Sequence, residues 1–401
     1  MNHYISLLKS EPVFAKLSLM QLISYFGAWF TNVAIYTLLL DMKVSAEVIA
    51  FTAALHFIAG VVQAPFSGSV IDRVKPKKLM LLLLGIEIVT TLLLVFVTDV
   101  SHLWLLFTLI FMRMAAASFY FTTVMSLLPK LLDGDKLQKA NEIHSIIWSI
   151  SYTLGMAISG FIVYLFGVTL AFIIDACMFM ISFYILYGLS FEVNTHKHAQ
   201  SFLFMMKDTF GYLKRSPKAL HLMFLHAFVG LTAFDALVAL IVDKYYASIL
   251  AVSLALGLLH AARAIGLVIG PIILGEWINN KRLFYLFIFQ AFGIWLWAIL
   301  IDNFYLSLAA SVVVGLFTTT LWSYTYTLLQ KNIEEQYYGR IVAYNDMLFL
   351  ISAAATSLMI GALASSDYSL EFITFILGSG FIVGGVYFAW VLKTQNIKEV
   401  N

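Results

Sequence analysis

Twelve long apolar runs alternate with short polar segments along this chain. The runs cover residues 14–40, 46–70, 78–98, 102–128, 141–165, 168–190, 219–242, 248–275, 282–301, 304–329, 339–364 and 370–392. A hydrocarbon core about 30 Å thick needs about 20 apolar residues per helix. The runs are too long for membrane β-strands and lack their two-residue alternation. The pattern therefore predicts an all-α integral membrane protein with twelve transmembrane helices.

The lysines and arginines fall mainly on one side of this predicted arrangement. With the N-terminus in the cytoplasm, 20 of the 24 lie in cytoplasmic segments or at the cytoplasmic ends of spans. Lys43 and Lys244 lie on the other side, while Arg113 and Arg263 lie inside spans. Because cytoplasmic loops carry an excess of Lys and Arg, we expect both termini to be cytoplasmic.

One polar interruption, residues 191–218, is longer than the others and divides the spans into two groups of six. Apolar residues recur in it at helical spacing from Phe202 to Leu213, among charged residues. This spacing predicts an amphipathic helix lying on the inner leaflet. We therefore expect an N-terminal bundle over 1–190, a cytoplasmic linker helix over 191–218 and a C-terminal bundle over 219–401.

The two groups of spans share local sequence features. Gly68 and Gly275 each follow the second span of a group, "ANE" at 140–142 corresponds to "YND" at 344–346, and Gly160 corresponds to Gly361. These matches lie 207, 204 and 201 positions apart. Internal repeats of this kind are typical of secondary transporters. The repeats predict two pseudo-symmetric six-helix bundles.

Composition supports a membrane protein and excludes several other classes. The chain is 62% hydrophobic and 11% charged, with a mean hydropathy of +0.92, whereas soluble domains carry about 25% charged residues. A net charge of +2 and the lack of a basic arm argue against a nucleic-acid partner. One cysteine gives no disulfide framework or zinc site, and no phosphate-binding loop indicates a nucleotide. We expect no metal and no cofactor, with an ion gradient as the energy source.

The N-terminal stretch "MNHYISLLKSEPVFAK" is polar and short. The apolar run after it is longer than the apolar region of a signal peptide and lacks a convincing cleavage site. The first span is therefore expected to remain in the mature protein.

The stretch "GSVIDRVKPKKL" between the second and third spans resembles a signature of the major facilitator superfamily. Further stretches resemble its branch of enterobactin exporters and macrolide efflux pumps: "QLISYFGAWFTNVA", "LLPKLLDGDKLQKANEI", "TFGYLKRSP" and "GRIVAYND". Two features depart from the family pattern. The fifth span reads "GMAISG" without the Gly-Pro of many antiporters, and "GEWINNKR" in the second half lacks the Asp-Arg pair.

The resemblance implies a gating role for Gly68, Asp72, Arg73 and Lys77. A carboxylate at a helix end can accept hydrogen bonds from a neighbouring helix N-terminus, and an arginine can bridge to a carboxylate. Such a latch would hold the cytoplasmic side closed. The alternative for the lysines of this stretch is that they only anchor the loop on the cytoplasmic side.

Charged residues inside the apolar runs are candidates for proton coupling, because a charge in the bilayer costs at least a few kcal/mol. The candidates are Arg113, Glu87, Asp175, Asp235 and Asp346. Arg113 matches an arginine that the resemblance links to proton coupling, with Glu87 or Asp175 as its expected partner. Each of these charges could instead belong to an ion pair that only stabilises packing.

Polar and aromatic residues within the spans are candidates for substrate binding, because aromatic rings beside hydrogen-bonding groups suit large amphipathic ligands. These are Gln21, Asn32, Tyr36, His56, Gln63, Trp148, His226, His260, Arg263, Trp322, Tyr324 and Tyr326. A histidine titrating near neutral pH could carry a proton or bind substrate, or it could simply link two helices. The histidine spacing gives no metal-ligand pattern.

These features together predict a proton-coupled secondary transporter in a bacterial inner membrane. Within the resemblance, it exports an amphipathic small molecule, either a siderophore or a hydrophobic drug, by alternating access. Its expected partners are that small-molecule substrate and membrane lipids, and we expect a monomer. Proton-coupled import of a metabolite and transport of a lysophospholipid or a metal ion remain alternatives. No catalytic constellation indicates an enzyme.

Overall fold

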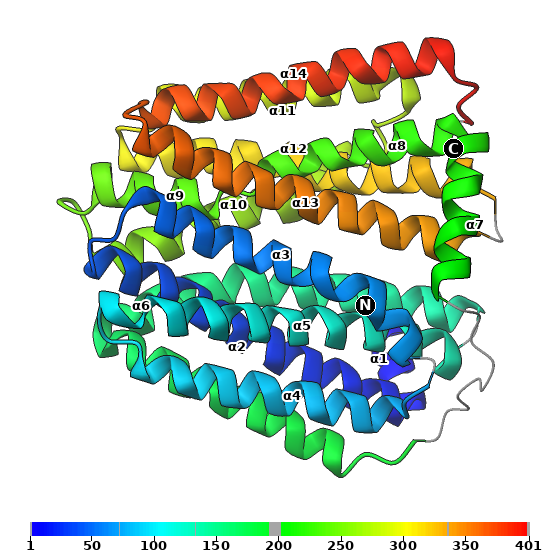
Figure 1. The fold of residues 1–401 in the computed structure, drawn as a ribbon, viewed down its shortest axis with the longest axis horizontal. Coiled ribbons are helices and arrows are strands. Elements are labelled where there is room, and N and C mark those ends of the chain that lie inside the picture. The colour runs from blue at the N-terminus through cyan, green and yellow to red at the C-terminus, as the bar shows by residue number, and fades with distance from the viewer. Residues whose placement is uncertain (1, 72, 133, 192–201, 335–336, 399–401) are drawn as a thin grey trace. The chain divides into compact units, whose positions relative to one another are not determined.

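The computed structural model describes residues 2–71, 73–132, 134–191, 202–334 and 337–398, and this part of the chain is helical without strands (Figure 1). The elements are α1 (Asn2–Ser10), α2 (Pro12–Asp41), α3 (Ala46–Ile71), α4 (Pro76–Leu93), η1 (Leu94–Phe96), η2 (Val100–His102), α5 (Leu103–Leu131), α6 (Gly134–Tyr187), α7 (Phe202–Arg215), α8 (Pro217–Ala227), η3 (Phe228–Thr232), α9 (Asp235–Ile241), η4 (Val242–Tyr246), α10 (Val252–Leu274), α11 (Asn280–Ile299), α12 (Phe304–Asn332), α13 (Tyr338–Ser365) and α14 (Leu370–Thr394). The predicted all-α membrane fold is confirmed.

α6 combines the fifth and sixth predicted spans, and Gly167 separates them. This glycine has φ 80° and ψ 171°, a conformation that costs glycine little. Side-chain hydrogen bonds tie the two parts of α6 to α2; among others they pair Ser151 with Leu22, Ser159 with Phe30, Asp175 with Thr31, and Ser182 with Ser24. The residue numbers of the α2 partners increase along α6 before Gly167 and decrease after it. The chain therefore reverses direction at Gly167, as two separate spans require.

The seventh predicted span, 219–242, is broken rather than continuous. α8 passes into the 3₁₀ turn η3, Ala233 leaves the helical conformation with φ −73° and ψ 72°, and α9 begins at Asp235. Gly230 lies in the break, where a Cβ atom would come within 2.7 Å of the Ser352 side chain on α13. Close packing of η3 against α13 therefore requires glycine at this position.

Contacts divide the chain into two compact units. Unit 1 contains Met1–Lys43, Val62–Ala199 and Ala251–Ala261, and unit 2 contains Val44–Val61, Gln200–Leu250 and Ala262–Asn401. The units follow the two sequence halves except for the first parts of α3 and α10, which are exchanged. α3 and α10 are the second spans of the two groups of six, so the exchange follows the internal repeat. The domain boundaries expected from the sequence stay a prediction.

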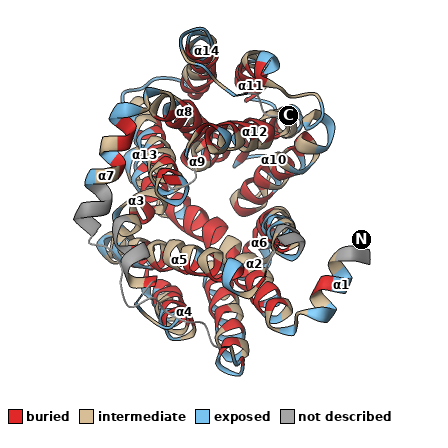
Figure 2. Cartoon of the chain, turned by 90° about the vertical axis from the view of Figure 1, so that its right-hand side faces the viewer, coloured by how far each residue is buried: buried red, intermediate tan, exposed pale blue. Residues whose placement is uncertain are grey.

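The most buried membrane spans are α2 in unit 1 and the segment from α8 to η4 in unit 2. Figure 2 shows buried residues along α8 and α12, whereas α4 and α14 carry a mixture of buried and exposed residues. Close packing in unit 2 depends on small residues: a Cβ on Gly266 of α10 would lie 2.0 Å from the Val312 oxygen of α12. Such contacts replace the hydrophobic driving force that is absent between helices in lipid.

The linker helix α7 packs against the start of α13, and both belong to unit 2. Asp208 on α7 forms an ion pair with Arg340 at 2.7 Å. The rings of Tyr212 and Tyr337 stack with centroids 4.2 Å apart, and the Tyr212 hydroxyl accepts from the backbone N–H of Glu334. These contacts fix α7 to the second half of the chain. Residues 192–201 of the predicted linker lie outside the described residues.

Candidate functional site

A buried charge cluster lies in unit 1, where α4, α5 and α6 approach α2. Arg113 on α5 donates from Nη2 to Asp175 Oδ2 on α6 at 2.7 Å and from Nε to Thr91 Oγ1 on α4 at 3.1 Å. The Thr31 hydroxyl on α2 also donates to Asp175. Arg113 is 4% exposed and Asp175 is fully buried. We call Glu87, Arg113, Asp175, Thr31 and Thr91 the charge cluster.

Gly27 on α2 leaves space for the Asp175 side chain of the charge cluster. A Cβ atom at this position would lie 2.6 Å from Asp175 Oδ1 and 3.0 Å from the Cβ of Met178. Asp175 Oδ1 itself forms no hydrogen bond in the structure, whereas Oδ2 receives two. The carboxylate is therefore held by one oxygen, and the other faces the backbone of α2.

Glu87 on α4 supplies a second carboxylate to the charge cluster and is 4% exposed. It interacts electrostatically with both Arg113 and Asp175. Tyr25 and Tyr120 also interact with Glu87, and their buried hydroxyls form no hydrogen bond with any described residue. Nothing in the sequence distinguishes these two tyrosines from tyrosines that only pack between helices.

A second region of unit 1 gathers aromatic side chains from α2 and the first part of α6. The Trp29 ring lies 4.6 Å from the Tyr152 ring, and Trp148 stacks on Tyr152 with centroids 5.4 Å apart. The Tyr152 hydroxyl lies 3.5 Å from Nδ1 of His260 on α10. The structure therefore brings the predicted binding residues Trp148 and His260 to the same tyrosine.

Unit 2 contains a further group, which we call the aromatic cluster: His226, Trp322, Tyr326, Asp346 and Phe349. The buried His226 ring of α8 lies 5.6 Å from Trp322 and 5.4 Å from Tyr326 of α12, and 5.8 Å from Phe349 of α13. Trp322 and Tyr326 stack with centroids 5.0 Å apart. Asp346 interacts with the hydroxyl of Tyr326. Four of these five residues were predicted site residues.

Arg263 lies at the break between α8 and α9 and forms no ion pair with a carboxylate of the described residues. Its Nη2 donates to the backbone oxygen of Thr232 at 2.9 Å, and its guanidinium lies 4.9 Å from the centre of the Phe234 ring. The broken helix leaves backbone groups without helical partners, and Arg263 satisfies one of them. Asp235 begins α9 directly after this break.

The other predicted binding residues are spread over both units. Tyr36 and Asn32 are buried on α2. The remaining ones form hydrogen bonds to neighbouring helices or to their own helix: Gln21 with His144, Gln63 with Ser118, His56 with the Thr52 oxygen, and Tyr324 with Asn280. Tyr324 therefore does not join the aromatic cluster, although it lies between Trp322 and Tyr326 in sequence.

The predicted gating motif is described only in part. Asp72 lies outside the described residues, and the structure describes Gly68 only as part of α3. Arg73 is exposed. Lys77 donates from Nζ to the Tyr187 oxygen at the end of α6 at 2.8 Å, where a cation complements the negative end of the helix dipole. The gating role of this motif stays a prediction.

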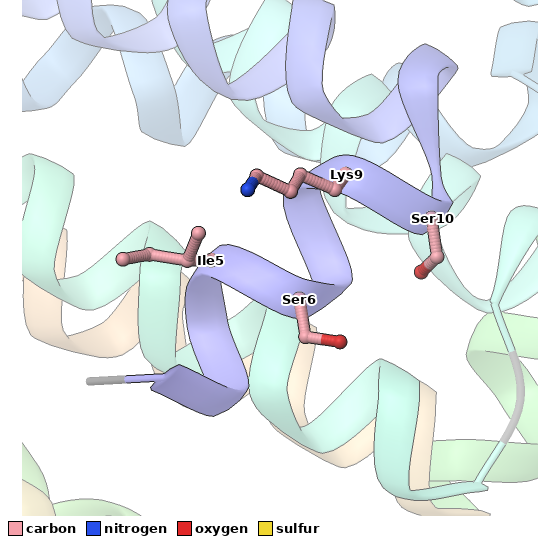
Figure 3. A pocket seen from close by; sticks show the side chains of 4 residues that line it. All are labelled: Ile5, Ser6, Lys9 and Ser10. Carbon is pink, nitrogen blue, oxygen red and sulfur yellow. The ribbon is translucent and has the colours of Figure 1, made fainter.

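A surface depression with a volume of about 540 Å³ lies against α1 and is lined by Ile5, Ser6, Lys9 and Ser10 (Figure 3). All four residues belong to one short amphipathic helix. None of them is a predicted site residue. The depression therefore does not bring together the chemistry seen in the charge cluster or the aromatic cluster.

Comparison with known proteins identifies a family over most of the chain. Residues 17–254 match the family described as Major Facilitator Superfamily. The uncharacterized MFS-type transporter YfiS of Bacillus subtilis (strain 168) is 28% identical over 203 residues, which make up 49% of this chain and 48% of that protein. This match spans about half the length of that relative.

Solved structures of several transporters share the fold. A bacterial homolog of the human lysosomal transporter Spinster, in an inward-facing and occupied conformation, has a TM-score of 0.76 at 13% identity and covers 97% of this chain and 98% of its own. A D-xylose-proton symporter has a TM-score of 0.74 at 10% identity and covers 93% of this chain and 97% of its own. The nucleoside transporter NupG has a TM-score of 0.73 at 14% identity and covers 96% of this chain and 100% of its own. At these identities the likeness concerns the fold alone.

Proposed function

The chain belongs to the major facilitator superfamily, and we propose that it is a proton-coupled secondary transporter that exports an amphipathic small molecule by alternating access. The proposal places it in a bacterial inner membrane with both termini in the cytoplasm. The observation that carries the proton coupling is the charge cluster, in which Asp175 forms an ion pair with Arg113 and a second buried carboxylate, Glu87, interacts electrostatically with both.

The charge cluster cannot be neutral unless one of its carboxyl groups holds a proton. Arg113 carries one positive charge, while Glu87 and Asp175 would together carry two negative charges. An uncompensated charge at 4% exposure or less is costly. Asp175 holds the direct ion pair and a second hydrogen bond from Thr31. Glu87 is therefore the residue that we assign as the proton carrier.

Loss of the proton from Glu87 would change how three helices are held together. The guanidinium of Arg113 would then face two carboxylates, one on α4 and one on α6. Its hydrogen bonds would be redistributed between Asp175 and Glu87, which alters the packing of α4, α5 and α6. A change in protonation is thereby converted into a bias between two packings, as alternating access requires.

The direction of transport rests on the resemblance of several stretches to exporters. The cargo class, a siderophore or a hydrophobic drug, is supported by aromatic groups in both units that could accept large amphipathic molecules. The second candidate is proton-coupled import. It is favoured by the sequence "GMAISG", which lacks the proline of many antiporters, and the fold is shared with a D-xylose-proton symporter.

Inverted membrane vesicles test coupling and direction in one experiment. Vesicles that contain the protein are energised with lactate, and the proton gradient is followed by acridine orange fluorescence. We expect added ethidium to dissipate the gradient and to accumulate inside the vesicles, as export by proton exchange requires. Vesicles with Glu87→Gln should retain the gradient and accumulate no ethidium.

Two results would contradict the proposal. Uptake of ethidium that is unaffected by an uncoupler would exclude proton coupling. Release of a preloaded compound from the vesicles, driven by the same gradient, would favour import. For the native cargo, culture medium from deletion and overexpression strains, grown with and without iron, is compared by untargeted mass spectrometry. A secreted compound that tracks expression and rises without iron would indicate a siderophore.

A further inference from the structure

Among the described residues, one ring nitrogen of His226 in the aromatic cluster has no hydrogen-bond partner. The Thr325 hydroxyl lies 2.8 Å from the Leu321 oxygen and 2.8 Å from Nδ1 of His226, and we assign its proton to the Leu321 oxygen, so that Nδ1 donates to Thr325. This places the proton of the neutral imidazole on Nδ1. Nε2 is then an acceptor, and it is buried without a partner. A buried acceptor of this kind is costly unless a ligand supplies the donor.

Asp346 is a negative charge in the same cluster without a positive partner. Within the described part of the chain it forms no ion pair, whereas Asp175 pairs with Arg113 and Asp208 pairs with Arg340. Its carboxylate interacts with the Tyr326 hydroxyl instead. Because Asp346 and Phe349 are three residues apart on α13, they lie on the same face of that helix. The aromatic cluster therefore has an acidic edge.

The aromatic rings of the cluster offer a flat, electron-rich surface. Trp322 and Tyr326 are four residues apart on α12 and stack with an angle of 18° between their planes. Trp322 is 40% exposed, while the histidine behind it is fully buried. Ring faces of tryptophan and tyrosine attract cations and stack on planar ligands.

We propose that the aromatic cluster of unit 2 binds an amphipathic organic cation that has a planar aromatic ring and an N–H donor. The ring of the ligand stacks on Trp322, and Asp346 balances its positive charge. Nε2 of His226, whose ring lies 5.6 Å from that of Trp322, accepts the N–H of the ligand. This inference rests on the proposed transport function and narrows its cargo to organic cations, since anionic catecholates would meet the charge of Asp346.

A matched control cluster exists elsewhere in unit 2. His221 on α8 lies 2.7 Å from the Tyr387 hydroxyl, and Tyr387 stacks on Trp390 with centroids 5.9 Å apart. Trp390 is 48% exposed, similar to Trp322. Here the histidine nitrogen Nδ1 is paired with a tyrosine. Substituting Trp390 removes an exposed tryptophan beside a histidine without touching the proposed site.

Fluorescence polarisation of two planar cations tests the proposal on the full chain purified in detergent. Ethidium carries two amino groups, whereas berberine has no N–H donor. We expect both cations to bind, and we expect Asp346→Asn and Trp322→Leu to lower the affinity for each by about tenfold. His226→Phe should lower the affinity for ethidium by about tenfold and change the affinity for berberine by less than about twofold. Trp390→Leu should change neither, and 2,3-dihydroxybenzoate should not compete.

The inference is overturned if Asp346→Asn and Trp322→Leu bind the cations like the unaltered protein, or if dihydroxybenzoate displaces them. Equal losses for ethidium and berberine in His226→Phe would overturn the assigned acceptor role of Nε2. If Trp322→Leu does not fold, as judged by size-exclusion chromatography, Trp322→Phe replaces it, with a smaller loss expected for both cations.

Binding and transport are measured separately, so the two proposals can fail separately. Binding that follows the expected pattern without proton-linked uptake into vesicles would overturn the transport function and leave the binding site. Proton-linked transport of another compound, with no cation binding, would overturn the site and leave the transport function.

Discussion

The charge cluster of unit 1 and the aromatic cluster of unit 2 differ in whether their acidic side chain is paired with a cation. In unit 1, Arg113 and Asp175 form a direct ion pair and threonines on two further helices bond to these charges, while Asp175 Oδ1 has no hydrogen bond among the described residues. In unit 2, Asp346 forms no ion pair among the described residues, and His226 Nε2 has no partner. An internally paired cluster can store a proton and hold helices together, whereas an incomplete one is suited to a ligand.

The sharpest test of this contrast removes one partner from each cluster. Arg113→Leu leaves Asp175 buried without its cation, and we expect a loss of about 3–5 kcal/mol in the free energy of unfolding. Asp346→Asn leaves no cation without its partner, and we expect the free energy of unfolding to change by less than about 1 kcal/mol. Denaturant titration of the purified variants in detergent measures both values.

The double variant Arg113→Leu with Asp175→Leu separates stability from coupling. Replacing a buried ion pair by apolar residues is often neutral or stabilising, so most of the lost stability should return. Proton-linked uptake into inverted vesicles should stay absent. A double variant as unstable as Arg113→Leu alone would show that the pair does not explain the loss.

Gly27 allows a test of how closely the backbone of α2 packs against the charge cluster. Gly27→Ala places a methyl group 2.6 Å from Asp175 Oδ1, and overpacking of this kind costs about 1–3 kcal/mol. Gly85→Ala on α4 is the matched control, since a Cβ there meets nothing within 4 Å. It should be neutral or stabilise by about 0.5–1 kcal/mol. Equal effects of the two substitutions on unfolding would contradict the assigned role of Gly27.

The sequence was sufficient to predict the apolar spans and the turn near Gly167, because hydropathy and helical periodicity depend on local composition. It could not predict the break between α8 and α9. The residues from Phe228 to Phe234 are as apolar as a continuous helix would be. The break depends on the close approach of Gly230 to α13 and on the hydrogen bond from Arg263, both of which are tertiary contacts.

Helical geometry would have refined one prediction about the candidate site. Trp322 and Tyr326 are four residues apart and share a helix face, whereas Tyr324 is two residues from each and faces elsewhere. It accordingly donates to Asn280 on α11 at 2.6 Å. The choice of Asp175 rather than Glu87 as the direct partner of Arg113 could not be made from sequence, because both carboxylates lie on neighbouring spans.

Arg263 provides a comparison with Arg113, since one intramembrane arginine bonds a backbone oxygen and the other a carboxylate. Arg263→Leu leaves the Thr232 oxygen without its donor, and we expect a loss of about 1–3 kcal/mol. Arg282→Leu is the control, because Arg282 contacts the Trp277 oxygen and ring in the same way but is exposed. The midpoint temperature of thermal unfolding should fall for Arg263→Leu and stay unchanged for Arg282→Leu. A larger fall for Arg282→Leu would contradict the role of burial.

Tyr120 tests whether a buried hydroxyl beside the charge cluster contributes to stability. Its buried hydroxyl forms no hydrogen bond, so Tyr120→Phe should leave the free energy of unfolding unchanged or raise it by up to about 1 kcal/mol. Tyr246→Phe is the control, because the buried Tyr246 hydroxyl donates to the Ile301 oxygen; it should lose about 1 kcal/mol. A similar loss for Tyr120→Phe would mean that its hydroxyl has a partner. If proton-linked uptake falls in Tyr120→Phe while stability does not, the hydroxyl serves proton transfer to Glu87 rather than packing.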